Sequence, residues 1–187
     1  MKRVAITGAN GFVGRALCHT LSTEGMEIIA VIHSGDVPQG ASETHRIGDI
    51  TDRTALRAAF EGVDAIVHLA GRAHVMQDDA ADPLAEYRRI NVEGTKNVTD
   101  CAADAGAQRV VFLSSIKVNG ERTDGKPFSE TDAPAPEDAY GVTKCEAEEA
   151  LFEIARARGI DAVCLRPPLV YGPGVRATFA ALMKLCD

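Results

Sequence analysis

Two side chains near the middle of the chain have the types and the spacing for acid–base chemistry. Tyr140 and Lys144 belong to the segment Tyr-Gly-Val-Thr-Lys at 140–144, and residues four apart share one face of a helix. An ammonium group near a phenol favours the tyrosinate and lowers the pKa of the phenol. Tyr140 is therefore a candidate general acid or base near neutral pH. The alternative is a core tyrosine beside a solvated lysine, because amphipathic helices often contain this pair.

A glycine-rich turn near the start of the chain indicates a dinucleotide site. The β-branched run 2–7 is followed by Gly8-Ala9-Asn10-Gly11-Phe12-Val13-Gly14 and then by a helical pattern. In the dinucleotide fingerprint, Gly8 would permit the tight turn, Gly11 would let the backbone approach a pyrophosphate, and Gly14 would let the helix pack closely on the strand. The N-terminus of that helix would present free N–H groups to the phosphates. The alternative is a glycine-rich turn without a ligand.

The elements that must position these residues alternate between strands and helices. Apolar runs that suit parallel strands covered on both faces lie at 2–7, 27–32, 44–47, 65–69, 109–113 and 162–165. A long helix is expected between Asp82, its cap, and Gly106, with Pro83 at its first position. A second apolar stripe runs ahead of Gly159. The β-α-β order predicts right-handed crossovers and an α/β fold, a Rossmann-type doubly wound parallel sheet with helices on both faces.

Ligands of such a fold bind at the carboxyl ends of the strands, and further candidate residues fall there. The residues expected at these ends are Asp49, Ile50, Leu69, Ala70, Gly71 and Ser115. Asp49 and Ile50 could hold an adenine, although a plain turn fits equally well. His68 is expected to be packed rather than catalytic. Asn91 lies on the inward stripe of its helix, where an unpaired amide would be costly, so it bonds either the sheet backbone or a water chain of the site.

Composition is that of an ordinary globular enzyme domain. The chain has 187 residues, 45% hydrophobic and 25% charged, with a net charge of −7. Because no Lys/Arg cluster is present, nucleic acid is not an expected partner. No secretory signal or apolar run of membrane-spanning length is found, so a cytoplasmic protein is expected. The five cysteines lack metal spacing, so no metal site is predicted.

Seven ordered motifs together resemble the extended short-chain dehydrogenases/reductases, the nucleotide-sugar epimerase/dehydratase family. They are Thr7 to Gly14, Gly48-Asp49-Ile50, His68 to Gly71, Asn91 to Thr95, Ser114-Ser115, Tyr140 to Lys144 and Arg166 to Gly174. The resemblance covers essentially the whole chain, and the Gly-x-x-Gly-x-x-Gly spacing is typical of short-chain enzymes. It implies a bound nicotinamide dinucleotide and a nucleoside diphosphate sugar as substrate.

The resemblance also implies a role for each site residue. Tyr140 would exchange the proton at the sugar C4 oxygen, Ser115 would hydrogen-bond that oxygen, and Lys144 would bind the nicotinamide ribose and depress the tyrosine pKa. Pro167 would place backbone against the carboxamide. The expected cofactor-binding residues are Gly8, Asn10, Gly11, Phe12, Val13, Gly14, His33, Ser34, Asp49, Ile50, Leu69, Ala70, Gly71, Asn91, Tyr140, Lys144 and Pro167.

Some positions depart from the family pattern. The family often has Val-Tyr-Gly after the serine, whereas this chain has Val118-Asn119-Gly120. Many members also have an asparagine that contacts pyrophosphate or sugar where this chain has Pro168-Leu169. NAD-specific members end the second strand with an acidic residue, whereas this chain has His33 and Ser34 after Ile32. Either NAD or NADP is therefore admissible, and the residues favour NADP slightly.

Two details resemble bacterial surface-polysaccharide enzymes that reduce a 4-keto-6-deoxy sugar nucleotide, namely Gly71 to Met76 and Ser115 to Gly120. The predicted function is therefore that of an NAD(P)-dependent 4-ketoreductase. The alternatives are a 4-epimerase of the same family, and a dinucleotide sensor or scaffold without turnover, against which the paired Tyr140 and Lys144 count.

The expected division of the chain is a dinucleotide-binding domain at 1–175 and the start of a truncated substrate lobe at 176–187, with a helix from 178 to 185. Because family members are expected to be much longer, we expect the 187 residues to bind dinucleotide without turning over a sugar nucleotide. A homodimer is compatible with the sequence.

Overall fold

Six parallel strands form a single sheet in the computed structural model, which describes residues 2–73 and 82–175. The strands are β1 (Arg3–Thr7), β2 (Glu27–Ile32), β3 (Glu43–Arg46), β4 (Ala65–His68), β5 (Arg109–Leu113) and β6 (Asp161–Leu165). Their order across the sheet is β3-β2-β1-β4-β5-β6, the order of the Rossmann fold. The predicted fold class is confirmed. The predicted unit at 176–187 and its helix lie outside the described residues.

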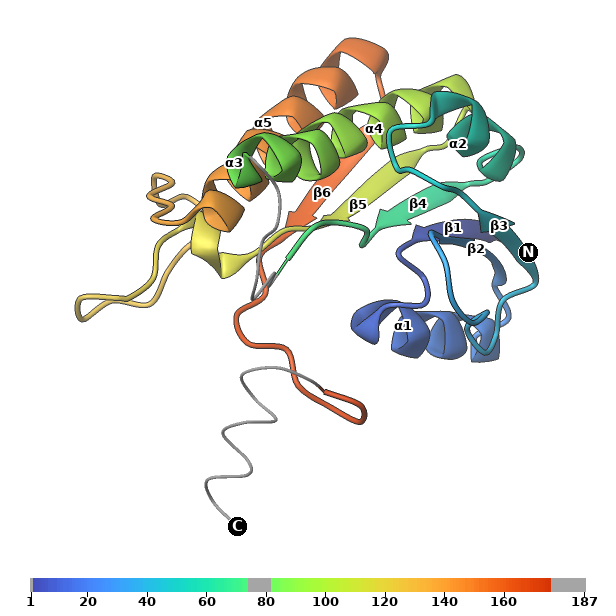
Figure 1. The fold of residues 1–187 in the computed structure, drawn as a ribbon, viewed down its shortest axis with the longest axis horizontal. Helices are drawn as coiled ribbons and strands as arrows, with labels where there is room; N and C mark the ends of the chain where they lie inside the picture. The colour runs from blue at the N-terminus through green and yellow to red at the C-terminus, as the bar shows by residue number, and fades with distance from the viewer. Residues whose placement is uncertain (1, 74–81, 176–187) are drawn as a thin grey trace.

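Helices cover both faces of the sheet, as Figure 1 shows. On one face lies α1 (Phe12–Thr23), and on the other lie α2 (Arg53–Ala59), α4 (Gly94–Asp104) and α5 (Ala139–Arg158). The segments α3 (Pro83–Tyr87) and η1 (Arg88–Glu93) lead directly into α4, and the short turn η2 (Ile116–Val118) follows β5. Because all six strands are parallel, each connection runs from the end of one strand back to the start of the next.

The alternation of side chains along the strands divides the core into two layers. On the α1 side, Val4, Ile6 and Ile28 pack with Cys18. On the opposite side, strand residues such as Ile29 join a larger cluster with α2, α4 and α5. Strands buried on both faces read as continuous apolar runs, which is why the sequence predicted a central strand such as β2 well.

Acidic caps and glycines set the helix boundaries. Asp82 accepts a hydrogen bond from the Ala85 N–H at 3.0 Å, and Pro83 occupies the first helical turn as predicted. Asp52 caps α2, a helix that the sequence analysis did not identify, by accepting from two N–H groups of its first turn. At its C-terminal end, α5 stops at Gly159 in the left-handed region, with φ 69°.

Candidate cofactor and active site

The glycine loop between β1 and α1 leaves no room for a side chain at Gly8 or Gly14. A Cβ on Gly14 would lie 2.4 Å from the carbonyl oxygen of Gly8. Gly8 itself has φ +67°, and its Cβ would lie 2.8 Å from the Ala70 nitrogen at the end of β4. Gly11 caps α1 without a side-chain hydrogen bond, so the first N–H groups of α1 remain available to a ligand. The loop therefore has the form that an approaching phosphate group requires.

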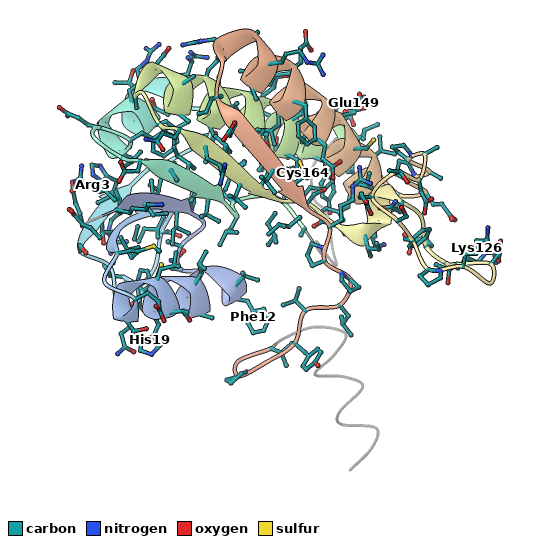
Figure 2. All side chains as sticks on the ribbon, turned by 180° about the vertical axis from the view of Figure 1, so that it is seen from behind. Arg3, Phe12, His19, Lys126, Glu149 and Cys164 are labelled. Atoms are coloured by element: carbon teal, nitrogen blue, oxygen red, sulfur yellow. The ribbon has the colours of Figure 1, made fainter. Side chains whose placement is uncertain are left out.

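A cavity of about 270 Å³ joins this loop to the predicted catalytic helix. Its lining residues are Gly8, Gly11, Phe12, Val13, Gly14, Leu69, Gly71, Ala73, Leu113, Ser114, Tyr140 and Lys144. Nine of these were predicted for the site from the sequence. Figure 2 shows Phe12 projecting from the start of α1 toward the segment that follows β6. The glycine loop and the Tyr/Lys pair therefore share one space at the carboxyl edge of the sheet.

A larger cavity, of about 340 Å³, lies between η2, the following loop, α5 and β6. Its main charged groups, Glu148 and Arg166, bond to each other through an Nη2–Oε2 contact of 2.6 Å. Because these charges are already paired and the glycine loop lies elsewhere, the smaller cavity is the candidate cofactor site.

Close packing brings Tyr140 to Ser115. A Cβ on Gly141 would lie 2.9 Å from the Lys117 carbonyl oxygen, so glycine lets the first turn of α5 approach η2. The Tyr140 phenol hydrogen-bonds Ser115, and this bond lowers the pKa of the phenol. Burial is the larger effect, however, and it raises that pKa above its ordinary value. The pKa of Tyr140 is thus raised, not lowered as expected from a neighbouring Lys144. Desolvation outweighs the charges that act on the phenol, of which Asp138 raises the pKa and Lys117 lowers it.

Lys144 is held at the end of β5 by the sheet backbone and an aromatic ring. Only 3% of the residue is exposed. Its Nζ donates to the Leu113 carbonyl oxygen at 2.9 Å and lies 4.3 Å from the centre of the Phe112 ring. The distance from Nζ to the centre of the Tyr140 ring is 5.9 Å. Burial lowers the pKa of Lys144 to about 8.

The side-chain amide of Asn91 connects the segment after β4 to α5. Its Oδ1 accepts from the Arg72 N–H at 2.8 Å, and its Nδ2 donates to the Arg72 carbonyl oxygen at 3.1 Å. The same Nδ2 donates to the Thr143 hydroxyl at 3.1 Å. Asn91 therefore bonds backbone in the segment that follows β4, and it holds the turn of α5 that lies between Tyr140 and Lys144.

His68 is packed, as expected. It is fully buried, its ring stacks on Phe112 at 5.3 Å between centres, and burial lowers its pKa to about 3. Because Thr95 donates its hydroxyl proton to the Asn91 carbonyl, it can only accept from His68 Nε2. His68 Nδ1 then accepts from the Thr7 hydroxyl at 2.6 Å. This relay ties β1 to β4 beside the glycine loop.

The adenine-side residues are engaged in local contacts. Asp49 accepts from the Thr51 N–H and pairs with Arg89 at 2.5 Å, and the bond from Thr51 is the main reason its pKa is lowered. Ile50 packs against Gly94, where a Cβ would lie 2.7 Å from an Ile50 methyl group. Residues 49–50 therefore form the plain turn that was the alternative to an adenine site, and the Asp49 carboxylate is already paired with Arg89.

Hydrogen bonds also join the segments that follow β1 and β2, and those that follow β5 and β6. Asn10 Nδ2 donates to the Ser34 carbonyl oxygen at 2.6 Å, and His33 Nδ1 lies 3.2 Å from Ser34 Oγ. At the other end of the sheet, the Pro167 carbonyl accepts from the Ile116 N–H at 3.1 Å. The backbone after β6 therefore lies directly beside the turn that follows Ser115.

Ser114 is a site residue that the sequence analysis did not select. It is buried, it lines the cavity, and its Oγ has no hydrogen-bond partner in the described part of the chain. A buried hydroxyl without a partner is unfavourable, so this position fits a polar group supplied by a ligand. The serine doublet at 114–115 was the available signal. Together with the glycine cradle, it shows that the residues present fit a dinucleotide.

Residues 2–73 and 82–175 contain no cluster of histidine, cysteine and acidic side chains that could hold a metal ion. No helix within them is long and apolar enough to cross a membrane.

A Rossmann sheet with a glycine loop and a Tyr/Lys pair around one cavity defines a short-chain dehydrogenase type of domain. The model of the NAD dependent epimerase/dehydratase family matches residues 4–184, and the chain belongs to this family. The cofactor class of the family is a nicotinamide dinucleotide, as predicted from the sequence.

Individual relatives agree with this assignment. A UDP-glucose 4-epimerase of Vibrio cholerae is 43% identical over 98% of this chain and 56% of its own length. MoeE5 in complex with UDP-glucuronic acid and NAD is 34% identical, with a TM-score of 0.82 over 93% of this chain and 57% of that structure. The UDP-glucose 4-epimerase of Thermus thermophilus in complex with NAD is 28% identical, with the same TM-score and the same coverage. The chain thus spans little more than half the length of these relatives.

Proposed function

We propose that the protein is a nicotinamide-dinucleotide-dependent oxidoreductase that reduces a keto group at C4 of a nucleoside diphosphate sugar. The observation that carries this proposal is that Tyr140 and Lys144 line the same cavity as the glycine loop. A proton donor and a cofactor cradle in one space are what hydride transfer to a carbonyl requires. Membership in the epimerase/dehydratase family supports the substrate class.

In the proposed reaction, Tyr140 gives its phenolic proton to the C4 oxygen while carbon C4 gains a hydride. A reduced nicotinamide supplies that hydride when it is bound. The raised pKa of Tyr140 keeps the phenol protonated at neutral pH, which suits the reductive direction. Ser115, which hydrogen-bonds Tyr140, would donate to the same developing oxyanion. Lys144, anchored to the Leu113 carbonyl, would bind the nicotinamide ribose.

A 4-epimerase is the second candidate, and the relative from Vibrio cholerae favours it. An epimerase must first remove a proton from the C4 hydroxyl, so its tyrosine has to begin as the phenolate. The two functions therefore differ in a measurable way. A reductase consumes reduced cofactor, whereas an epimerase interconverts two sugars with no net oxidation.

The test incubates the protein, as its natural gene encodes it, with UDP-4-keto-6-deoxyglucose and reduced dinucleotide carrying deuterium at nicotinamide C4. We expect a product with one deuterium at sugar C4, detected by mass spectrometry. UDP-glucose without reduced cofactor is the parallel assay, and formation of UDP-galactose there would establish the epimerase instead. If dinucleotide binds but neither product forms, the proposal that the protein is an enzyme would be overturned, and a sensor or scaffold would remain.

The residue-specific arm of the test is Tyr140→Phe. Loss of a general acid costs about 10²–10⁴-fold in turnover, while the Kd for the dinucleotide should change little, because the ring remains. The control is Arg109→Ala, since Arg109 begins β5 at the opposite edge of the sheet. Full activity of the phenylalanine variant would contradict the proposed mechanism.

A further inference from the structure

We infer that the end of β2 recognises a 2′-phosphate, so that the chain selects NADP(H) over NAD(H); this rests on the proposed cofactor role of the glycine loop. In dinucleotide folds, an acidic residue about 20 residues beyond the loop bonds the ribose 2′-hydroxyl of NAD, whereas an arginine accommodates the 2′-phosphate of NADP. In this chain Ile32 ends β2, and His33 and Ser34 follow it. Both are potential hydrogen-bond donors to phosphate.

The glycine loop holds this segment at the right place for an adenosine ribose. Asn10 in the loop donates from Nδ2 to the Ser34 carbonyl oxygen at 2.6 Å. The following residue is equally close, because a Cβ on Gly35 would lie 3.2 Å from the same Asn10 nitrogen. His33 Nδ1 and Ser34 Oγ lie 3.2 Å apart, so an imidazole and a hydroxyl form a local pair. The 33–35 segment is therefore adjacent to the proposed pyrophosphate turn.

Two guanidinium groups flank this segment. Arg46 ends β3, where it pairs in register with Ile32, and its Nη1 donates to the Gly35 carbonyl oxygen at 2.6 Å. On the loop side, Arg15 Nε donates to the Asn10 carbonyl oxygen at 2.9 Å. Each guanidinium keeps further N–H donors beyond the one used here. The two cations come from different elements, and each bonds a backbone carbonyl of one of the two segments that the Asn10–Ser34 bond joins.

Most arginines of the described residues pair with carboxylates, whereas Arg15 and Arg46, like Arg122 and Arg156, do not. Arg3, Arg53, Arg88, Arg89 and Arg166 are examples of arginines paired with carboxylates. Within 2–73 and 82–175, no such ion pair is found for Arg15 or Arg46; both donate to backbone oxygens instead. In a chain of net charge −7, cations without a carboxylate partner are suited to an anionic ligand.

The acidic residues near the segment are few. Asp36 is the one acid in 33–42, and its negative charge counts against the two arginines. Glu43 on β3 lies close in sequence to Arg46, but its carboxylate pairs with Arg3 at 2.5 Å and with His45 at 2.7 Å. The local excess of positive charge therefore remains. The solved relatives named above hold NAD, so the inferred preference sets this chain apart from them.

The test measures binding by isothermal titration calorimetry of the 187-residue chain with NADPH, NADH, 2′,5′-ADP and ADP. We expect NADPH to bind at least about 10-fold more tightly than NADH, because charge-assisted hydrogen bonds to the phosphate are absent in NADH. The same order should hold for 2′,5′-ADP over ADP, which isolates the 2′-phosphate from the nicotinamide. The preference should shrink as salt screens the exposed arginines.

Substitutions locate the effect. Arg46→Ala should lower the NADPH/NADH affinity ratio while NADH affinity holds, and His33→Asp should reverse the preference. Arg109→Ala, the same charge change at the opposite edge of the sheet, should leave the ratio unchanged. Equal or tighter binding of NADH to the wild type, or an unchanged ratio in Arg46→Ala, would overturn the inference alone. Failure of all four ligands to bind would overturn the proposed cofactor site as well.

Discussion

At the residue scale, burial decides the electrostatics of the site. Lys144 and Tyr140 stand at the spacing that the sequence displays, yet the distance from the ammonium to the phenol ring is 5.9 Å, and both groups are desolvated. The sequence therefore predicted which residues meet but not the direction of the tyrosine pKa. That direction depends on how much water surrounds each group, which a residue spacing does not encode.

Lys144→Met tests the cost of burying this ammonium. The pKa of Lys144 falls from 10.5 to about 8 on folding. Below pH 8 the lysine is charged in both states, and the folded state carries the full desolvation cost. Between pH 8 and 10.5 the unfolded chain keeps a proton that the folded chain has released, so stability rises with pH.

We therefore expect the methionine variant to be more stable than the wild type at pH 7 by about 1–3 kcal/mol, since the lost bond to the Leu113 carbonyl offsets part of the gain. The advantage should vanish near pH 10.5. Urea unfolding of both proteins at pH 7 and pH 10 measures this difference. A methionine variant that is less stable at pH 7 would show that contacts of Lys144 outweigh its desolvation.

At the element scale, local signals predicted the strands and the caps but missed features made by tertiary contacts. The helix expected from Asp82 to Gly106 forms, but residues Arg88–Glu93 within it adopt π-helical geometry. In this stretch the Asn91 side chain bonds Arg72, a partner far away in sequence. The short α2 had a visible signal, its Asp52 cap, but offers little periodicity because it is only seven residues long.

A buried ion pair fastens the catalytic helix to the last strand. Glu148 lies one turn beyond Lys144 on α5, and its carboxylate accepts from Arg166 Nε at 2.9 Å and from Nη2 at 2.6 Å. Arg166 Nη1 also donates to Asn119 Oδ1 at 3.1 Å. The Glu148 side chain is only 5% exposed. The pair therefore joins α5, the end of β6 and the turn after Ser115.

Glu148→Ala should lower the free energy of unfolding by about 3–5 kcal/mol, because it leaves a mostly buried guanidinium without its partner. Replacing both residues, as Glu148→Leu with Arg166→Met, should cost much less than the single change. A double-mutant cycle by urea unfolding measures the coupling. Simple additivity of Glu148→Leu and Arg166→Met would mean that the pair does not fasten these elements.

At the scale of the whole molecule, the strand order brings segments from all along the chain to one edge. The apolar runs were enough to predict the class of sheet, because strands covered on both faces lack polar alternation. They could not show where coverage ends. On β6, Ala162 and Cys164 pack against the core cluster that includes α5, so Val163 and Leu165, which are 39% and 49% exposed, face the opposite side of the sheet. Nor could they show that β3 places Arg46 beside the end of β2.

The central claim is that the glycine loop holds the pyrophosphate of a nicotinamide dinucleotide at this edge. The most direct measurement is the Kd for NADPH of the wild type, Gly11→Ala and Gly11→Val, with circular dichroism and urea unfolding to confirm the fold. A Cβ at Gly11 would lie 3.1 Å from the Gly8 carbonyl oxygen, so the loop can accept one with a small shift. We expect micromolar binding by the wild type, weaker binding by the alanine variant, and a loss of at least about 100-fold in the folded valine variant, because its side chain would occupy the space of the phosphates. Unchanged affinity in a folded Gly11→Val protein would contradict the account.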